Sequence, residues 1–193
     1  MDIKEKLRRI NSHGDRRLHR IVYESLPALV ESVEPLDRKV IRLRHIADAA
    51  AKVIAPFTPC AKGCSACCHN PAIVSEVDAM LIAQATGTPL SSPRELFDVA
   101  AGEEARRKYV SRYAGVPCTF LKDSICSIYA HRPVVCRVHH SLEDTPAGCE
   151  RGRQPKAVDL TELYLGELRM MGRMMIYADI REFFPPQAAA AAQ

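Results

Sequence analysis

The sequence has no tryptophan, and only 6% of its 193 residues are aromatic. That scarcity argues against a surface on which nucleic-acid bases stack on aromatic side chains. The formal net charge of +4 is also mild, and it would fall to about zero if eight thiolates held two zinc ions. We therefore expect no nucleic-acid partner.

Long apolar runs are missing as well. Charged residues interrupt every apolar stretch well before the roughly 20 residues that a membrane-spanning helix needs. The first residues, 1–6, read MDIKEK and have none of the apolar core of a secretion signal. We therefore expect a cytoplasmic protein with no membrane partner, in a compartment where thiols stay reduced.

Cysteine is absent from residues 1–59 and from residues 150–193. All eight cysteines lie between these two regions, at Cys60, Cys64, Cys67, Cys68, Cys118, Cys126, Cys136 and Cys149. In a reducing compartment, such a concentration of thiols is better explained by metal binding or redox chemistry than by structural disulfides.

The rest of the chain reads as helical. Apolar residues recur at helical spacing over 18–33 and 40–54, with a break at Pro35 and an end at Pro56, and the two helices could pack as an antiparallel pair. Ser75 resembles a helix cap, and Gly87 is a plausible stop.

Two further helices are expected from their starts. Ser92, followed by Pro93 and Glu95, predicts a helix that could run to Gly115. A last long helix is expected from near Asp159 until Pro185. With no strand alternation of any length, the sequence predicts a mainly α protein, a helical scaffold with cysteine-rich metal-binding loops.

We divide the chain accordingly into four regions. These are an N-terminal helical region at 1–56, a cysteine-cluster metal-binding domain at 57–150, a C-terminal helix packing on it at 151–185, and a disordered tail at 186–193.

The first cysteine group has the spacing of a metal-binding loop. Two residues between Cys64 and Cys67 let a tight turn aim both sulfurs at one ion, and Cys60 adds a third sulfur. Gly63 permits such a turn. Cys68 is different, because adjacent side chains diverge. Cys67 and Cys68 therefore serve different sites, or one of them is a spare thiol, or the two form a strained disulfide.

In the second group, Pro133 favours a short helix with Cys136 in or near its first turn. The helix dipole, Arg132 and Arg137 would then favour a thiolate at Cys136, although a solvated surface role for these arginines is an equal alternative. His69, His139 and His140 are further candidate ligands, each less favoured than an ordinary exposed or core histidine.

These motifs together resemble the YkgJ-type cysteine-cluster family, also described as the CxxCxxCC zinc- or iron-chelating domain. The resemblance rests on C-x3-C-x2-CC at 60–68, PC-x-FL at 117–121, C-x-IY at 126–129 and RP-x-x-CR at 132–137. It implies that seven of the cysteines bind metal, and with less assurance Cys149. The first gap is three residues here, where the family's name has two.

The metal itself is left open by the sequence. Eight sulfurs fit two four-thiolate zinc sites, or one 4Fe–4S cluster with other thiols free or on a second ion. The spacing of the first three cysteines matches radical S-adenosylmethionine enzymes, but the βα alternation of their barrel is missing.

Two functions compete. The first is a structural or sequestering metal-binding protein, with room for a protein partner. The second is an iron–sulfur or thiol-based redox or electron-transfer protein, because the thiols exceed one four-ligand site. No substrate pocket or reaction can be read, and among enzyme classes an oxidoreductase is favoured. Catalysis by a metal-bound water or a Cys–His pair is a lesser alternative.

Overall fold

The computed structural model describes residues 1–13, 15–149, 156–172 and 175–186. Its longer helices are α1 (Ile3–His13), α2 (Asp15–Arg20), α3 (Leu26–Glu31), α4 (Leu36–Ile54), α5 (Glu76–Thr86), α6 (Glu103–Ser111) and α8 (Thr161–Met171). The shorter ones are α7 (Val134–Val138), α9 (Ile180–Phe183), the π-helix η1 (Ile21–Ser25) and the 3₁₀ turns η2 (Ala55–Phe57), η3 (Ala66–His69), η4 (Tyr129–His131) and η5 (Pro146–Cys149). The prediction of a mainly α protein is confirmed.

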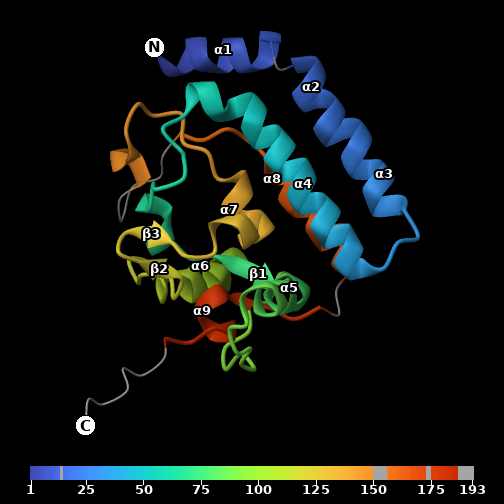
Figure 1. Ribbon diagram of the computed structural model, residues 1–193, viewed down its shortest axis with the longest axis vertical. Helices are drawn as coiled ribbons and strands as arrows, with labels where there is room; N and C mark the ends of the chain where they lie inside the picture. The colour runs from blue at the N-terminus through green and yellow to red at the C-terminus, as the bar shows by residue number, and fades with distance from the viewer. Residues whose placement is uncertain (14, 150–155, 173–174, 187–193) are drawn as a thin grey trace.

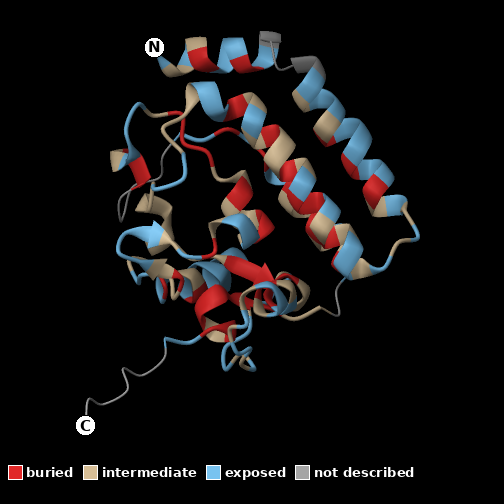
Figure 2. Ribbon diagram, viewed as in Figure 1, coloured by how far each residue is buried: buried red, intermediate tan, exposed pale blue. Residues whose placement is uncertain are grey.

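Helix α4 is the centre of the helical layer. The α2–η1–α3 segment runs antiparallel along one side of it, α8 lies against it, and α7 covers another side (Figure 1). Figure 2 shows a buried stripe along α4, which is the face toward these neighbours. The core there is apolar and includes Leu26, Leu29, Leu43, Ile54 and Leu163, each at most 1% exposed. The predicted antiparallel pair is therefore present.

A small sheet organises the other half of the molecule. Strand β1 (Ile73–Ser75) pairs antiparallel with β4 (Tyr177–Asp179), so that Ile73 lies opposite Asp179. Strands β2 (Leu121–Lys122) and β3 (Ile125–Cys126) form a separate hairpin. The β1–β4 pair brings the C-terminal segment against the middle of the chain, and β1 and α9 are mostly buried (Figure 2).

Local signals identify α5 correctly. The Ser75 hydroxyl accepts a hydrogen bond from the Asp78 backbone N–H, which caps the helix. Gly87 ends it with a positive φ of 69°, a conformation that glycine adopts without steric cost. Pro35 and the Ala55–Phe57 turn likewise bound α4 where the sequence predicts.

The helix expected from Ser92 is wrong in its start. Helix α6 begins only at Glu103. The backbone N–H groups of Arg94 and Glu95 instead donate to the Glu182 carboxylate, and the Phe97 N–H donates to the Tyr177 carbonyl. Tertiary partners thus satisfy the amides that a helix would have used.

The single long helix expected over 159–185 is also wrong. Helix α8 ends at Met171, and the next residue, Gly172, has a positive φ of 69°. The chain then forms β4 and the one-turn helix α9. The predicted tail, 186–193, lies outside the described residues except for residue 186. Among the described residues, no helix is long and apolar enough to cross a membrane.

Candidate metal centre

The first cysteine segment is a tight turn followed by η3. The Cys64 backbone N–H donates to the Ala61 carbonyl, and Gly63 between them has a φ of +99°. The η3 turn then carries Cys67 and Cys68, with the Cys68 N–H donating to the Ser65 carbonyl at 2.9 Å. The expected loop with a glycine at its bend is therefore present.

The second cysteine segment combines the β2–β3 hairpin with α7. Asp123 and Ser124 turn the hairpin with positive φ values of 47° and 60°, and Leu121 lies opposite Cys126. Pro133 is the residue before the first turn of α7, and Cys136 is the third residue of that helix. This agrees with the short helix that Pro133 predicts.

Backbone hydrogen bonds join the two segments. The Cys118 N–H donates to the Cys68 carbonyl at 2.8 Å, and the Gly115 N–H donates to the His69 carbonyl at 2.7 Å. On the other side, the Ser141 N–H donates to the Cys60 sulfur at 3.3 Å, and η3 packs beside η5, which ends at Cys149. Cysteines far apart in sequence are thus gathered in one region.

The side chain of Arg181 stabilises this junction. Its guanidinium donates to the carbonyls of Cys68 and Asn70 in the first segment and to those of Val116 and Pro117 just before Cys118. It also pairs with the fully buried Asp179 at 2.7 Å. One side chain from α9 therefore fixes the backbones of both cysteine segments.

Arg137 plays a similar part around α7. It is 6% exposed, pairs with Asp48 of α4 at 2.6 Å, and donates to the carbonyls of Ala130 and Arg132. It is therefore a buried anchor, neither a solvated charge nor a direct partner of a thiol. Arg132 instead lies over the Tyr129 ring, and its charge lowers the pKa of the Cys136 thiol against a larger effect of burial.

Burial favours the protonated form of several of the gathered thiols by raising their pKa. It raises the pKa of the Cys136 thiol well above its usual value, and the thiols of Cys67, Cys118 and Cys126 raise it further. Burial likewise raises the pKa of Cys149 to about 11, with Cys60, Cys67 and Cys64 adding to the effect. The two cysteine segments are therefore close enough to influence one another electrostatically.

The donor chemistry of this region fits a thiophilic metal. All eight cysteines are free thiols, and Cys149 is buried while the others are partly buried. The disulfide considered between Cys67 and Cys68 is not formed. Within the described ranges, however, no three His, Cys, Asp or Glu side chains lie in an arrangement that could hold a metal ion. A coordination shell would require these side chains to move closer together.

The histidines beside Cys136 differ in their surroundings. The Nε2 atom of His139 lies 3.7 Å from the Cys149 sulfur. The Nε2 atom of His140 contacts the Arg137 carbonyl at 2.9 Å, while its buried Nδ1 has no protein partner. Burial lowers the pKa of both imidazoles, which favours the neutral form that binds metals.

A buried network of charged and polar side chains, which the sequence did not predict, connects the helices next to the cysteine region. Arg44 of α4 donates to the Asp78 carboxylate, and Asp78 also accepts from the Val134 N–H of α7. The Ser75 hydroxyl donates to Glu167 of α8 at 2.9 Å. Burial, together with the nearby Asp78, raises the pKa of Glu167 to about 8. These contacts tie α4, α5, α7 and α8 together.

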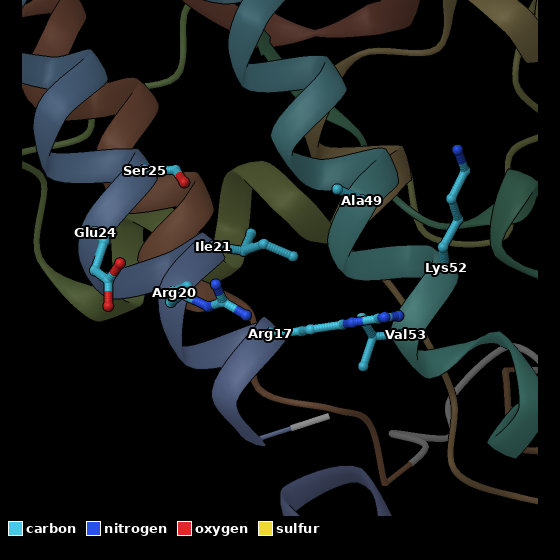
Figure 3. Close-up of a pocket in the computed structure, with 8 residues that line it drawn as sticks. All are labelled: Arg17, Arg20, Ile21, Glu24, Ser25, Ala49, Lys52 and Val53. Carbon is cyan, nitrogen blue, oxygen red and sulfur yellow. The ribbon is translucent and has the colours of Figure 1, made fainter. Parts of the chain in front are cut away.

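Two cavities differ in the residues that line them. An open groove of about 470 Å³ lies between the α2–η1 segment and α4, and Figure 3 shows Arg17 and Lys52 on its two walls. Its described lining contains no cysteine or histidine. A smaller pocket of about 280 Å³ is lined by Cys67, Cys136 and His139 together with mostly apolar residues. Of these two cavities, the smaller one opens onto the cysteine region.

Comparison with known families agrees with this chemistry. Residues 59–151 match the model of a family described as CxxCxxCC, a putative zinc- or iron-chelating domain. This part of the chain is therefore similar to a CxxCxxCC domain. The resemblance predicted from the motifs is thereby confirmed for this family. The matched region of the CxxCxxCC domain contains all eight cysteines. Comparisons with curated proteins and with solved structures give no significant match.

Proposed function

We propose that this protein binds zinc or iron through its cysteine cluster, in a structural or sequestering role. The ligands come from the set Cys60, Cys64, Cys67, Cys68, Cys118, Cys126, Cys136 and Cys149. The observation that carries the proposal is the backbone junction at which Cys118 is hydrogen-bonded to Cys68, inside a region that matches a metal-chelating domain.

The state of the thiols supports the same conclusion. Neighbouring buried thiols such as Cys67 and Cys136 disfavour ionisation of one another, so their thiolate forms need a cation that replaces the protons and offsets the repulsion between the negative charges. The bound metal would supply the positive charge that holds several thiolates together. Arg181 and Arg137 keep the backbones in place, so binding requires only local closure of side chains and loops.

Metal removal tests the proposal. We expect purified protein to contain zinc or iron, and we expect a chelator to lower its melting temperature because site formation is coupled to folding of the cysteine region. Elemental analysis and circular dichroism on the same sample measure both effects. A protein that contains no metal, takes none up under reducing conditions and melts identically with chelator would contradict the proposal.

A second candidate function is redox or electron transfer. It is favoured by the small pocket of about 280 Å³, which is lined by Cys67 and Cys136, and by the adjacent free thiols of Cys67 and Cys68 in η3. An iron–sulfur cluster would show charge-transfer absorption after anaerobic purification. A colourless protein whose metal and thiols resist mild oxidants would exclude this function.

We further propose that the protein works in the cytoplasm, where the thiols stay reduced. A protein partner is compatible with its helical surface. Neither proposal affects the metal-binding test, which uses the purified chain alone.

A further inference from the structure

His139 and Cys149 form a close pair of metal-type donors that the CxxCxxCC pattern does not mention. The two residues are ten positions apart in the sequence: His139 comes just after α7, and Cys149 is the last residue of η5. The His139 Nε2 atom and the Cys149 Sγ atom are 3.7 Å apart. Because the pattern names only cysteines, nothing in it assigns a role to this imidazole.

The separation is the one that a shared metal ion would impose. Zinc lies about 2.3 Å from a thiolate sulfur and about 2.0–2.1 Å from an imidazole nitrogen. At a tetrahedral angle of about 109°, these bond lengths place the two donor atoms about 3.6 Å apart. The observed 3.7 Å therefore needs almost no adjustment of either side chain.

The surroundings of the pair supply further donors. Cys149 is buried, and the thiols that influence it most are those of Cys60, Cys67 and Cys64 in the first segment. Cys60 is itself positioned from this side, since its sulfur accepts a hydrogen bond from the Ser141 N–H. The packing of η3 beside η5 and the Ser141–Cys60 hydrogen bond thus place the pair beside the first cysteine segment.

We propose that His139 Nε2 and Cys149 Sγ bind the same four-coordinate thiophilic ion, such as Zn²⁺, with the remaining ligands coming from the first cysteine segment. This inference rests on the proposed metal binding and specifies one of its sites. On binding, the Cys149 thiol proton is released to solvent, and the imidazole binds through the Nε2 lone pair with its proton on Nδ1. The ion is bound without any change of oxidation state.

Counting His139 as a ninth donor also removes the need for the adjacent Cys67 and Cys68 to bind the same ion. Two four-coordinate ions need eight ligands, and His139 raises the number of available donors to nine. One of the adjacent Cys67 and Cys68 thiols can then stay outside the coordination shells. The adjacent thiols need not share an ion.

The test uses the full chain loaded with Zn²⁺ under reducing conditions. Zinc-edge X-ray absorption of the unaltered protein should show a mixed nitrogen and sulfur shell with the outer-shell scattering of an imidazole. His139→Ala and Cys149→Ser should each remove about one zinc ion per chain or weaken that site by about 100-fold or more, since even outer-shell changes cost 10–100-fold. His139→Cys should restore the ion with a shell of sulfur alone.

His45→Ala is the matched control, because His45 is an exposed histidine on α4, and it should leave zinc content and affinity unchanged. The double variant His139→Ala/Cys149→Ser should lose no more zinc than either single variant. A sulfur-only shell in the unaltered protein, or His139→Ala with unaltered zinc content and affinity, would overturn this inference while leaving metal binding intact. Unaltered protein that binds no metal would instead overturn the proposed function. The absorption measurement needs no variant, so a sulfur-only shell would overturn the inference even if His139→Ala misfolded, and His139→Cys then distinguishes His139 from the other histidines.

Discussion

Arg181 is the side chain whose loss should most directly separate the two cysteine segments. It is 5% exposed, and its guanidinium bridges the carbonyl of Cys68 in the first segment and that of Pro117 before the second. It is also the ionic partner of the buried Asp179. Arg181→Met keeps the apolar stem and removes only the charged head, so it isolates these interactions from packing.

The expected loss of stability follows from the burial of the Arg181–Asp179 ion pair. Removing one member of a buried ion pair leaves an uncompensated charge and typically costs about 3–5 kcal/mol. For a chain of this size, each kcal/mol lowers the melting temperature by about 2–4 °C, so we expect Arg181→Met to melt about 6–20 °C lower. The thiols of Cys68 and Cys118 should also become more accessible, because their backbones are no longer fixed.

Urea unfolding and the rate of thiol labelling in metal-free protein measure the two effects. Arg169→Met is the matched control, because Arg169 forms an exposed ion pair with Glu162 at 3.1 Å, and such pairs contribute at most about 1 kcal/mol. Adding Asp179→Asn to Arg181→Met should recover part of the loss. A loss below about 1 kcal/mol in Arg181→Met, with unchanged labelling, would refute the role of Arg181 as the clamp.

Two further predictions concern the scaffold. Because burial raises the pKa of Glu167 to about 8, the folded state binds more protons than the unfolded state between pH about 4.5 and about 8, and stability should fall as pH rises through that window. Glu167→Gln should flatten the dependence, and urea midpoints at pH 5 and pH 8 would show whether it does. Gly166→Ala should cost about 1–3 kcal/mol by overpacking, because its Cβ would lie 2.4 Å from a methyl group of the buried Leu26. Gly102→Ala meets no atom within 4 Å and should change the melting temperature much less; equal shifts for the two would contradict the packing argument.

Elements with local signals could be predicted from the sequence, and elements that depend on distant partners could not. Helix α5 has its cap at Ser75 and its stop at Gly87, so both ends are encoded in a short stretch. The start signals at Ser92 and Glu95 are equally good locally, but Glu182 takes up the backbone amides there and no helix forms. Strand β1 is only three residues long, too short to show an alternation, and it exists because β4 pairs with it.

In the candidate site too, features with a local sequence signal could be predicted, and features that depend on distant partners could not. The spacing of the first cysteines predicts the turn at Gly63, and Pro133 predicts the short helix at Cys136. No spacing rule indicates that the Cys118 N–H donates to the Cys68 carbonyl, because that contact depends on how the segments pack. One signal for the missed ion pair was available: Asp179 and Arg181 lie, with Glu182, among apolar residues at 175–184, and charged side chains in such a stretch are usually buried in pairs.

The way in which the cysteines are gathered bears on what the metal does for the fold. Very small metal-binding modules have too little apolar core to fold without their ion. Here the two cysteine segments are joined by backbone hydrogen bonds and by the buried Arg181. Arg137 ties the second segment to α4, which has an apolar core of its own. The scaffold therefore does not depend on sulfur–metal bonds for its overall arrangement. Metal loss should loosen the region around the thiols and leave the helical core in place, as we expect for the proposed sequestering role.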